Sequence, residues 1–348
     1  MRKGFTLIEL VVAVALLSMV LSFAGLIFNV SIDSHRTAKA SAEIMRNLRA
    51  ITDQLNTDFA GIQTDAPLLI SFKQDPADPN QRYDQIMFFA NGDFQSIQTY
   101  LGSSGNAVPH PDGEWVLKGN AARIHYAQAQ FYEDGRYIEP YDDDMDEQDR
   151  MLARRQHILS ASDRLKAWPN VNMSNFNFRD NEELEYDRLS LVEWNTVDGG
   201  EYDTIVRECF EPDARPLIDM ESPEGPEETF HKLMCEGVGS FAIQWAYWGQ
   251  DDKRFYWFPS DDPDGDGSDR DSHFDSMPDE FGVYFNIPGS INEREWYSIE
   301  DAEDKAGEDF SAFPRALKFT FRLYDSKGII EREGEKGREF THIVYLGG

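Results

Sequence analysis

One acidic stretch of the chain has the residue types and the spacing of a calcium loop. In Asp262-Pro263-Asp264-Gly265-Asp266-Gly267 the carboxylates stand at alternate positions and a glycine occupies the sixth. Hard oxygen ligands at this spacing begin an EF-hand-type loop, because Ca²⁺ takes six to eight oxygens. The twelfth position is His273, so Asp269, Asp271 or Asp275 would have to complete the ligand set. The alternative interpretation is a solvated acidic turn that proline and glycine bend.

The two cysteines of the chain are Cys209 and Cys235. In an exported domain they fit one disulfide, which would close a loop over the acidic residues 220–229. Two free buried thiols fit the same spacing. A zinc site formed by both cysteines and His231 lacks a fourth ligand, so the sequence does not favour it.

The sequence contains no residue arrangement that is typical of an enzyme. It has no Gly-x-Ser-x-Gly, no glycine-rich phosphate loop, and no His-Glu-x-x-His among its seven histidines. Carboxylate pairs are plentiful, but a chain with 64 acidic residues forms such pairs by chance. We therefore predict no catalytic residue.

The first thirty residues combine a basic leader, a glycine and an apolar segment that holds one carboxylate. Met1-Arg2-Lys3-Gly4 precedes Phe5-Thr6-Leu7-Ile8-Glu9, and an uncharged run follows over residues 10–32. This run is long enough to cross a bilayer, and the basic leader predicts a cytoplasmic N-terminus. A secretory signal would be cut after its apolar region, whereas this run lies beyond the leader and would be retained. A carboxylate at the edge of a membrane helix is costly, so we expect Glu9 to have a partner.

The remainder of the chain is strongly acidic. The formal net charge is −31 over 348 residues, and the residues after Glu9 carry all of it. Such a field repels nucleic-acid backbones and anionic lipid surfaces, so nucleic acid is not an expected partner.

The apolar helix is predicted to continue beyond the membrane. An apolar stripe recurs every three or four residues, at Ile44, Leu48, Ile51, Leu55 and Phe59. The helix is expected to run from about residue 5 to residue 59, a length of roughly 80 Å, and to end at Gly61.

Strand patterns dominate after this helix. Asn91-Gly92 predicts a hairpin between strands at 85–90 and 94–100. Alternating or aromatic-rich runs predict further strands at 122–130, 189–194, 241–247, 255–258, 281–285, 317–323 and 338–346. The last two of these are expected to pair.

The predicted fold is α+β, with a long N-terminal α-helix packed on an antiparallel β-sheet domain. Residues 1–4 form a leader, 5–32 a transmembrane and assembly helix, 33–61 its amphipathic continuation, and 62–348 the exported β-rich domain. Residues 135–181 are predicted to be an acidic, helical insertion, with a helix at 145–168 that Pro169 stops.

The leader resembles the class III signal peptide of type IV pilins and pseudopilins, and the string Gly-Phe-Thr-Leu-Ile-Glu carries the resemblance. The resemblance implies that a prepilin peptidase cuts between Gly4 and Phe5 and methylates the new amino terminus on Phe5. It also implies that Glu9 pairs with the N-terminal amine of a neighbouring subunit.

Three later segments resemble the J-type minor pseudopilin of type II secretion systems. They are Tyr83-Asp84-Gln85-Ile86-Met87-Phe88-Phe89, Glu236-Gly237-Val238-Gly239-Ser240-Phe241, and Phe313-Pro314-Arg315-Ala316-Leu317-Lys318-Phe319 with Arg338-Glu339-Phe340. The resemblance implies a single-pass protein of the bacterial inner membrane with a periplasmic domain and no enzymatic activity. Its expected partners are the I-type and K-type minor pseudopilins and the major pseudopilin. Together the minor subunits form the tip of a pseudopilus, which primes assembly and helps to export folded proteins. The chain is longer than expected for this family, and residues 135–181 have no recognisable counterpart in it.

Two other functions fit the same sequence. A W-like minor pilin would prime a true type IV pilus, and a retraction-dependent phenotype would favour it. A calcium-dependent binding module on a pilin stalk would use the Asp262 loop and residues 135–181, and its binding would vanish with a chelator.

Overall fold

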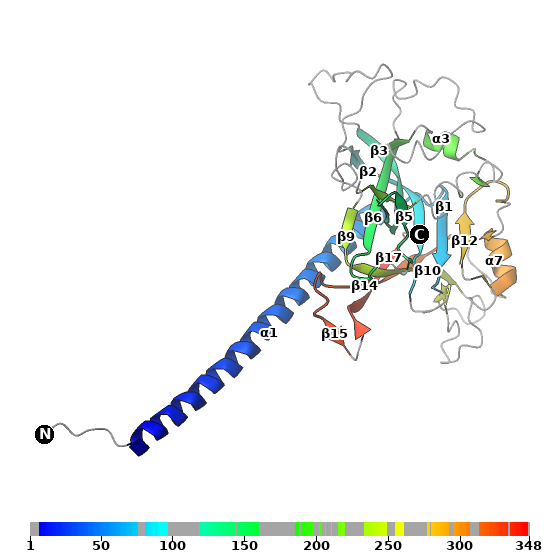
Figure 1. The fold of residues 1–348 in the computed structure, drawn as a ribbon. Coiled ribbons are helices and arrows are strands. Elements are labelled where there is room, and N and C mark those ends of the chain that lie inside the picture. Colours follow the sequence, from blue (N-terminus) through cyan, green and yellow to red (C-terminus); the bar gives the residue numbers. More distant parts are fainter. Residues whose placement is uncertain are drawn as a thin grey trace, which may run out of the picture.

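The computed structural model consists of one long helix and a β-rich globular domain (Figure 1). The described residues are 7–75, 81–96, 118–142, 145–159, 185–187, 189–195, 197, 202–203, 206, 210, 215–219, 233–248, 255–260, 277–278, 280–291, 295–306, 313–332 and 335–346. The mixed architecture confirms the predicted α+β fold class.

Helix α1 (Leu7–Ala60) continues for 54 residues without a break, a length of about 80 Å. Its N-terminal half projects away from the globular domain (Figure 1). Its C-terminal half buries one stripe of apolar residues, which are Ala40, Ile44, Ile51, Leu55 and Phe59. Spacings of about one or two helical turns place these residues on one face, as a helix packed on one side requires. The prediction of one continuous helix is confirmed.

The helix ends where Gly61 passes close to strand β2 (Gln85–Gln95). The carbonyl oxygen of Gly61 accepts a hydrogen bond from the backbone N–H of Asn91 at 2.7 Å. A Cβ atom on Gly61 would lie 1.9 Å from the carbonyl oxygen of Asn91, so a residue with a side chain does not fit this crossing. The next residue, Ile62, forms an antiparallel bridge with Ala90. These contacts fix the end of α1 against the sheet.

The larger sheet follows the order β13-β12-β1-β2-β3-β6-β7, with β9 also paired to β6. Its strands are β1 (Leu68–Lys73), β2, β3 (Lys118–Gln128), β6 (Met151–Leu159), β7 (Tyr186–Asp187), β9 (Leu233–Glu236), β12 (Glu280–Phe285) and β13 (Trp296–Tyr297). The pairs β12–β13 and β6–β7 are parallel, and the other pairs of this sheet are antiparallel.

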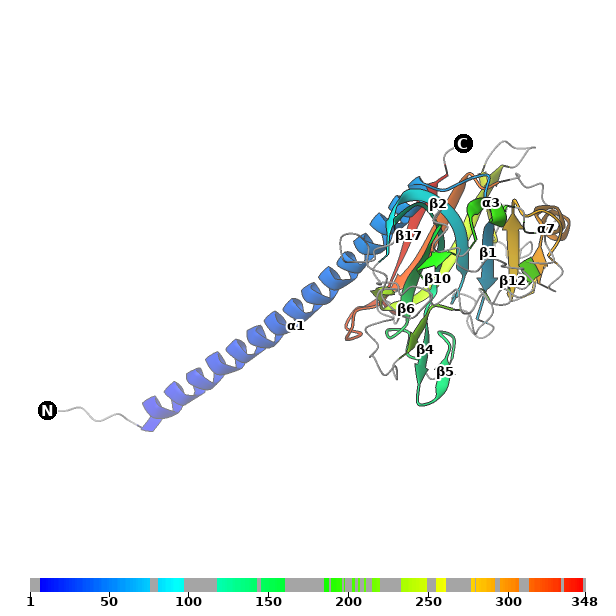
Figure 2. The same ribbon diagram turned by 90° about the horizontal axis from the view of Figure 1, so that it is seen from above.

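The second sheet is antiparallel and follows the order β11-β10-β14-β17. Its strands are β11 (Phe255–Phe258), β10 (Val238–Trp248), β14 (Ala316–Leu323) and β17 (Arg338–Tyr345). Smaller elements are the sheet of β4 (Gln130–Glu133), β5 (Arg136–Ile138) and β8 (Leu217–Asp219), the hairpin of β15 (Glu331–Arg332) and β16 (Glu335–Lys336), and helices α3 (Leu191–Trp194) and α7 (Ile299–Ala306). The hairpin of β4 and β5 projects from the body of the domain (Figure 2).

The main core lies between α1 and the two sheets. Strand alternation sends Ile86, Phe88 and Ala90 of β2 into this core, and β14 contributes Leu317, Phe319 and Phe321. The ring of Phe59 on α1 lies 4.2 Å from that of Phe88 and 5.4 Å from that of Phe319, measured between centroids. One aromatic residue of the helix therefore touches both sheets.

The opposite face of the larger sheet is also covered. Met87 and Phe89 of β2 point to this side, where they pack with Trp194 of α3 and with Tyr202. Arg123 on β3 extends into this second layer and pairs with Asp187 at 2.9 Å, with both side chains fully buried. A strand that is buried on both faces reads as a continuous apolar run, and residues 86–90 have this character.

A buried carboxylate holds the last turn of α1 to the larger sheet. Asp58 is 3% exposed, and Arg154 of β6 donates to its two oxygens from Nε at 2.6 Å and from Nη2 at 2.8 Å. The hydroxyl of Tyr126 donates to the same carboxylate. Burial opposes the charge of Arg154, but the hydrogen bonds and the charge of Asp58 outweigh this effect and raise the pKa of Arg154. Such a bidentate pair fixes orientation as well as distance.

A second buried carboxylate lies where the small sheet of β4, β5 and β8 joins the domain. Glu139 follows β5, and its Oε2 lies 3.9 Å from Nε of the buried Arg215. Arg215 also donates from Nη2 to the carbonyl oxygen of Tyr83 at 2.9 Å. Burial raises the pKa of Glu139 to about 7, and the charge of Arg215 offsets part of this rise.

The predicted hairpin at Asn91-Gly92 is wrong. Strand β2 continues through both residues and pairs with β3 on either side of them. The register shifts between Asn91 and Phe94, so β2 holds one extra residue there, which is a β-bulge. Asn91 is held in the strand by Gly61 and by the side chain of Gln63, whose Nε2 donates to it at 2.8 Å. These non-local contacts override the local turn preference of the dipeptide.

The predicted helix over 145–168 is also wrong for its described part. Residues 151–159 form β6, which lies between β3 and β7 in the larger sheet. Polar residues stand on both faces of this strand, because Arg154 binds Asp58 on one side and Arg155 is buried on the other. The sequence of this strand therefore shows no regular alternation of apolar and polar residues. Residues 151–159 lie within the interval predicted as an insertion, yet they are an internal part of the sheet.

A third local prediction, the strand at 189–194, is replaced by helix α3. Ser190 caps this helix, and a capping box joins it to Glu193. The Ser-x-x-Glu signal is present in the sequence and indicates a helix start. The predicted strands at 122–130, 241–247, 255–258, 281–285, 317–323 and 338–346 are found as β3, β10, β11, β12, β14 and β17.

The Asp58 contact generates a prediction about stability. Asp58→Asn should lower the free energy of unfolding by about 3 kcal/mol, because it leaves the Arg154 guanidinium inside the domain without its anion. Urea unfolding of the detergent-solubilised chain, followed by tryptophan fluorescence, measures this change. Asp53→Asn is the matched control on the exposed side of the same helix, and it should change stability by less than about 0.5 kcal/mol. Equal effects of the two variants would contradict the role given to Asp58.

The raised pKa of Glu139 generates a prediction about pH. Because the folded protein holds this proton more tightly than the unfolded chain, the stabilisation is complete below the unfolded pKa of 4.5. It is lost as pH rises through about 7. Glu139→Gln should therefore gain stability relative to the unmodified protein when the pH is changed from 5 to 8. Urea midpoints of both proteins at the two pH values give this difference. A difference that does not change with pH would refute the assignment.

Candidate functional site

The N-terminal half of α1 is apolar on all sides. Glu9 stands in the first turn of α1, where the partial positive charge of the helix terminus favours a carboxylate. Every large apolar side chain between Leu7 and Val30 is at least 52% exposed. A helix with such a surface belongs in a membrane or among other helices. Gly4 and Phe5 lie outside the described residues.

Helix α1 is long and apolar enough to cross a membrane. An 18-residue window in it has a mean hydropathy of 2.7, and none of that window is buried in the domain. A core helix of a soluble domain would be mostly buried, so this segment does not serve the globular core. These properties fit a membrane-anchored protein.

Two segments far apart in the sequence meet at the junction of the two sheets. Tyr83 and Phe241 form a parallel bridge. The backbone N–H of Asp84 donates to the carbonyl oxygen of Phe241 at 3.0 Å, and the N–H of Phe241 donates to that of Arg82 at 2.8 Å. The hydroxyl of Ser240 accepts from the N–H of Arg82 at 3.0 Å. The segments Tyr83-Asp84 and Ser240-Phe241 therefore form one hydrogen-bonded structural unit.

The carboxylate of Asp84 is the centre of this junction. It is fully buried and accepts hydrogen bonds from the N–H of Lys73 at 3.0 Å and from the N–H of Ile243 at 2.7 Å. The guanidinium of Arg82 pairs with it as well. Burial raises the pKa of Asp84, and Arg82 and the two backbone donors offset part of this rise. One side chain thus connects β1 of the larger sheet to β10 of the second sheet.

The third segment singled out in the sequence forms the closing strand pair. Strands β14 and β17 pair in register from Leu323 opposite Arg338 to Ala316 opposite Tyr345, as predicted. Strand β17 also touches the assembly helix, because Nε2 of His342 lies 3.0 Å from Oδ1 of Asn56 on α1. The segments named in the sequence thus pack against one side of the C-terminal half of α1.

The predicted calcium loop and one of the two predicted disulfide cysteines fall outside the part of the chain that the structure describes. Asp262, Asp264, Asp266, Asp269 and Asp271 lie outside the described residues, and so does Cys209. Within the described residues, no group of three or more His, Cys, Asp or Glu side chains could hold a metal ion.

Cys235 on β9 carries a free, buried thiol. It donates to the carbonyl oxygen of Glu236 at 3.2 Å. Burial raises the pKa of this thiol to about 12, so it is neutral and unreactive at neutral pH. The disulfide with Cys209 stays a prediction.

Sequence reasoning missed the charged residues that anchor the helix and join the sheets. Asp58 stands three residues after Leu55 and directly before Phe59, so it lies on the apolar stripe of α1. An acid on such a stripe is a signal of a buried partner. Asp84 and Arg82 gave no comparable signal, because charges near a strand start are usually solvated.

Comparison with known proteins adds one finding. Residues 1–25 match the family described as the prokaryotic N-terminal methylation motif. Neither a curated protein sequence nor a solved structure matches the chain. The motif, together with the exposed apolar half of α1, supports a type IV pilin-like protein that is anchored in a membrane and has a structural role.

Proposed function

We propose that this protein is a J-type minor pseudopilin of a type II secretion system, without enzymatic activity. The methylation motif at residues 1–25, which begins a 54-residue helix, is the observation that carries this proposal. The motif supports the pilin-like class. The finer assignment depends on the three segments that resemble the J-type family.

In this proposal the N-terminus is processed before assembly. A prepilin peptidase cuts between Gly4 and Phe5 and methylates the amine of Phe5. The chain crosses the bacterial inner membrane once, with its N-terminus on the cytoplasmic side and its β-rich domain in the periplasm. Glu9 lies within an apolar surface, where a carboxylate is costly. The amine of a neighbouring subunit neutralises it and sets the position of that neighbour along the helix.

The proposed partners are the I-type and K-type minor pseudopilins and the major pseudopilin. The exposed apolar half of α1 would pack among their helices, and the globular domain would stand at the filament tip. There the minor subunits prime the pseudopilus, which helps to export folded proteins through the outer membrane.

A W-like minor pilin of a type IV pilus is the second candidate, because the methylation motif is common to both systems. Calcium binding by the Asp262–Asp271 loop remains a separate proposal that rests on the spacing of its carboxylates. Loss of a glycan or protein ligand on addition of a chelator would favour a binding module on a pilin stalk.

The assembly role of Glu9 is tested by Glu9→Ala. This variant should be cleaved normally after Gly4 but should assemble poorly, because the amine on Phe5 loses its partner. Gly4→Asp is the comparison that separates the two steps, since it should block cleavage itself. Mass spectrometry of the N-terminus reports cleavage, and recovery in sheared filament or tip fractions reports assembly. Normal assembly of Glu9→Ala would rule out the proposed pairing.

The system to which the protein belongs is tested by complex formation. Residues 35–348, mixed with the soluble domains of the I-type and K-type subunits of the same organism, should form a stable ternary complex. Size-exclusion chromatography with light scattering, with calcium present, measures its mass. Absence of a complex at micromolar concentration would favour the pilus-priming candidate over the secretion system.

A further inference from the structure

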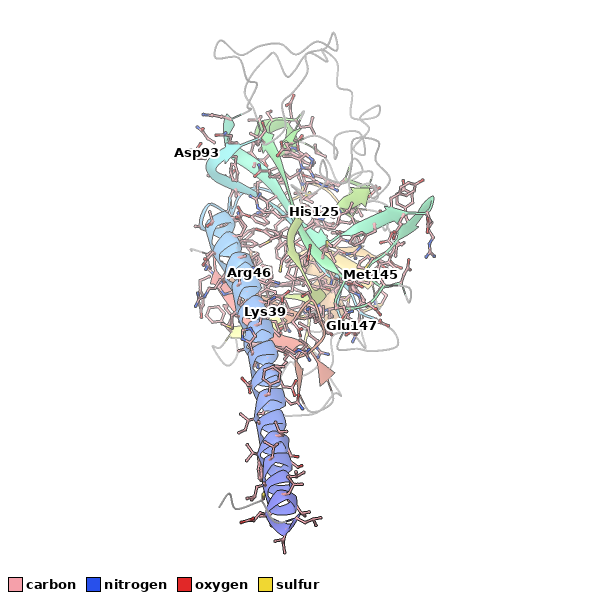
Figure 3. All side chains as sticks on the ribbon, turned by 60° about the vertical axis from the view of Figure 1, so that its left-hand side comes forward. Lys39, Arg46, Asp93, His125, Met145 and Glu147 are labelled. Atoms are coloured by element: carbon pink, nitrogen blue, oxygen red, sulfur yellow. The ribbon has the colours of Figure 1, made fainter. Side chains whose placement is uncertain are left out.

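A cavity of about 570 Å³ lies between α1 and the globular domain. Glu43, Arg46 and Asn47 of α1 form one wall. The other walls come from the β4–β5 hairpin, the segment 145–151 and β9. Figure 3 labels Arg46 on the helix and Met145 on the globular domain, and both residues line the cavity.

The floor of this cavity is apolar and adaptable. Its apolar lining residues are Phe131, Ile138, Met145, Met151 and Met234, and all of them are partly exposed. Methionine has an unbranched, polarisable side chain, so a methionine-rich surface adjusts to apolar side chains of different shapes. Water-exposed apolar residues that gather in one hollow indicate a contact site.

The rim of the cavity is acidic. Glu133, Asp146, Asp149 and Glu236 line it and are exposed, and Arg46 is the cation among the lining residues. Glu43 is a further acid, but it accepts hydrogen bonds from the N–H and the hydroxyl of Ser326 at 3.3 Å. The opening therefore attracts cationic groups and repels anionic ones.

The cavity has a defined shape in the isolated chain. The contact of Glu43 with Ser326 holds α1 on one side. The side-chain amide of Asn47 donates to the carbonyl oxygen of Glu236 at 3.3 Å, which holds α1 against β9. An occupant would not have to open the helix away from the domain, so little energy is lost in preparing the site.

We propose that this acidic methionine pocket docks a cationic apolar segment of a neighbouring subunit in the assembly. In such a segment one apolar side chain would lie on the methionine floor, and adjacent Lys or Arg side chains would meet the carboxylates of the rim. This inference rests on the proposed assembly function. A second copy of this chain is a poor occupant, because its net charge of −31 would be repelled.

The position of the pocket along α1 favours a subunit as the occupant. Glu43 lies ten residues after Asp33, the first charged residue beyond the apolar run, which is about 15 Å along the helix. When two such helices pack together through their apolar halves, the part of the neighbouring chain that lies next to its own globular domain comes level with Glu43. One wall of the pocket is thus formed by α1, the same helix whose apolar half packs against neighbouring subunits in the proposed assembly.

Photo-crosslinking in the full chain tests the occupant. A benzoylphenylalanine placed at Met145 probes the pocket in membranes of the cells that produce the protein. The same group at Val192, which is 73% exposed on α3, is the control. We expect Met145 to crosslink to another assembly subunit, at a peptide that mass spectrometry shows to combine apolar residues with Lys or Arg. Crosslinks to a second copy, to lipid or to an acidic peptide, or no crosslink above the Val192 control, would overturn the proposal.

Charge reversal tests the rim. The double variant Asp146→Lys and Asp149→Lys should lower the Met145 crosslink at least about tenfold, since like charges at an interface strongly oppose binding. Glu300→Lys with Asp304→Lys on α7 makes the same change of charge elsewhere and should have no effect. Asp146→Asn with Asp149→Asn, which perturbs folding less, should give an intermediate loss. An unchanged crosslink in the reversed variant would refute the pocket while leaving the Glu9 test of assembly unaffected.

Discussion

The requirement that one helix serve two environments constrains the rest of this structure. The first half of α1 presents apolar side chains on every side, whereas the second half must be held by a soluble domain. A continuous apolar stripe would suffice for adhesion, but it would not fix the rotation or the height of the helix. Asp58 fixes both the rotation and the height, because Arg154 and Tyr126 can reach its carboxylate in only one orientation of the helix. The stacking of Phe59 on Phe88 and its contact with Phe319 then engage both sheets at the same level. The direction in which the exposed half projects is thus decided by contacts in the last turn.

A buried carboxylate also fixes the position of the two sheets at their junction. Sheets that pack through apolar side chains alone can slide, whereas the carboxylate of Asp84 joins the backbones of Lys73 and Ile243. A second buried ion pair lies on the opposite, covered face of the larger sheet, where Arg123 pairs with Asp187. Buried ion pairs of this kind contribute more to a unique arrangement than to net stability. A subunit of the proposed filament needs such a unique arrangement.

Much of this architecture could be predicted from the sequence, and the failures have a common cause. The length of α1 and strands β10, β14 and β17 follow from periodicity, because each has one apolar face, whereas β12 follows from its short apolar run and the end of α1 from Gly61. Strand β6 could not be found, because Arg154 and Arg155 obscure both of its faces. The Asn91-Gly92 turn failed because Gly61, thirty residues earlier, binds Asn91 and keeps it within one continuous strand. Of the candidate site, the leader and Glu9 are local signals, whereas Asp58 and Asp84 acquire their roles from partners that only the fold supplies.

The distribution of charge limits how this protein can contact others. Among the described residues, the buried set includes five arginines, which are Arg82, Arg123, Arg150, Arg155 and Arg215, and six carboxylates, which are Asp58, Asp84, Glu139, Glu185, Asp187 and Asp325. The buried charges of these residues nearly cancel, so they contribute little to the net charge of −31. A neighbour that approaches such a surface must bring cations or bury apolar area, and the acidic methionine pocket offers both kinds of contact in one place. In the proposed assembly, association through the apolar half of α1 confines the partner to the membrane, and the charge of the domain selects which neighbour can stand beside it.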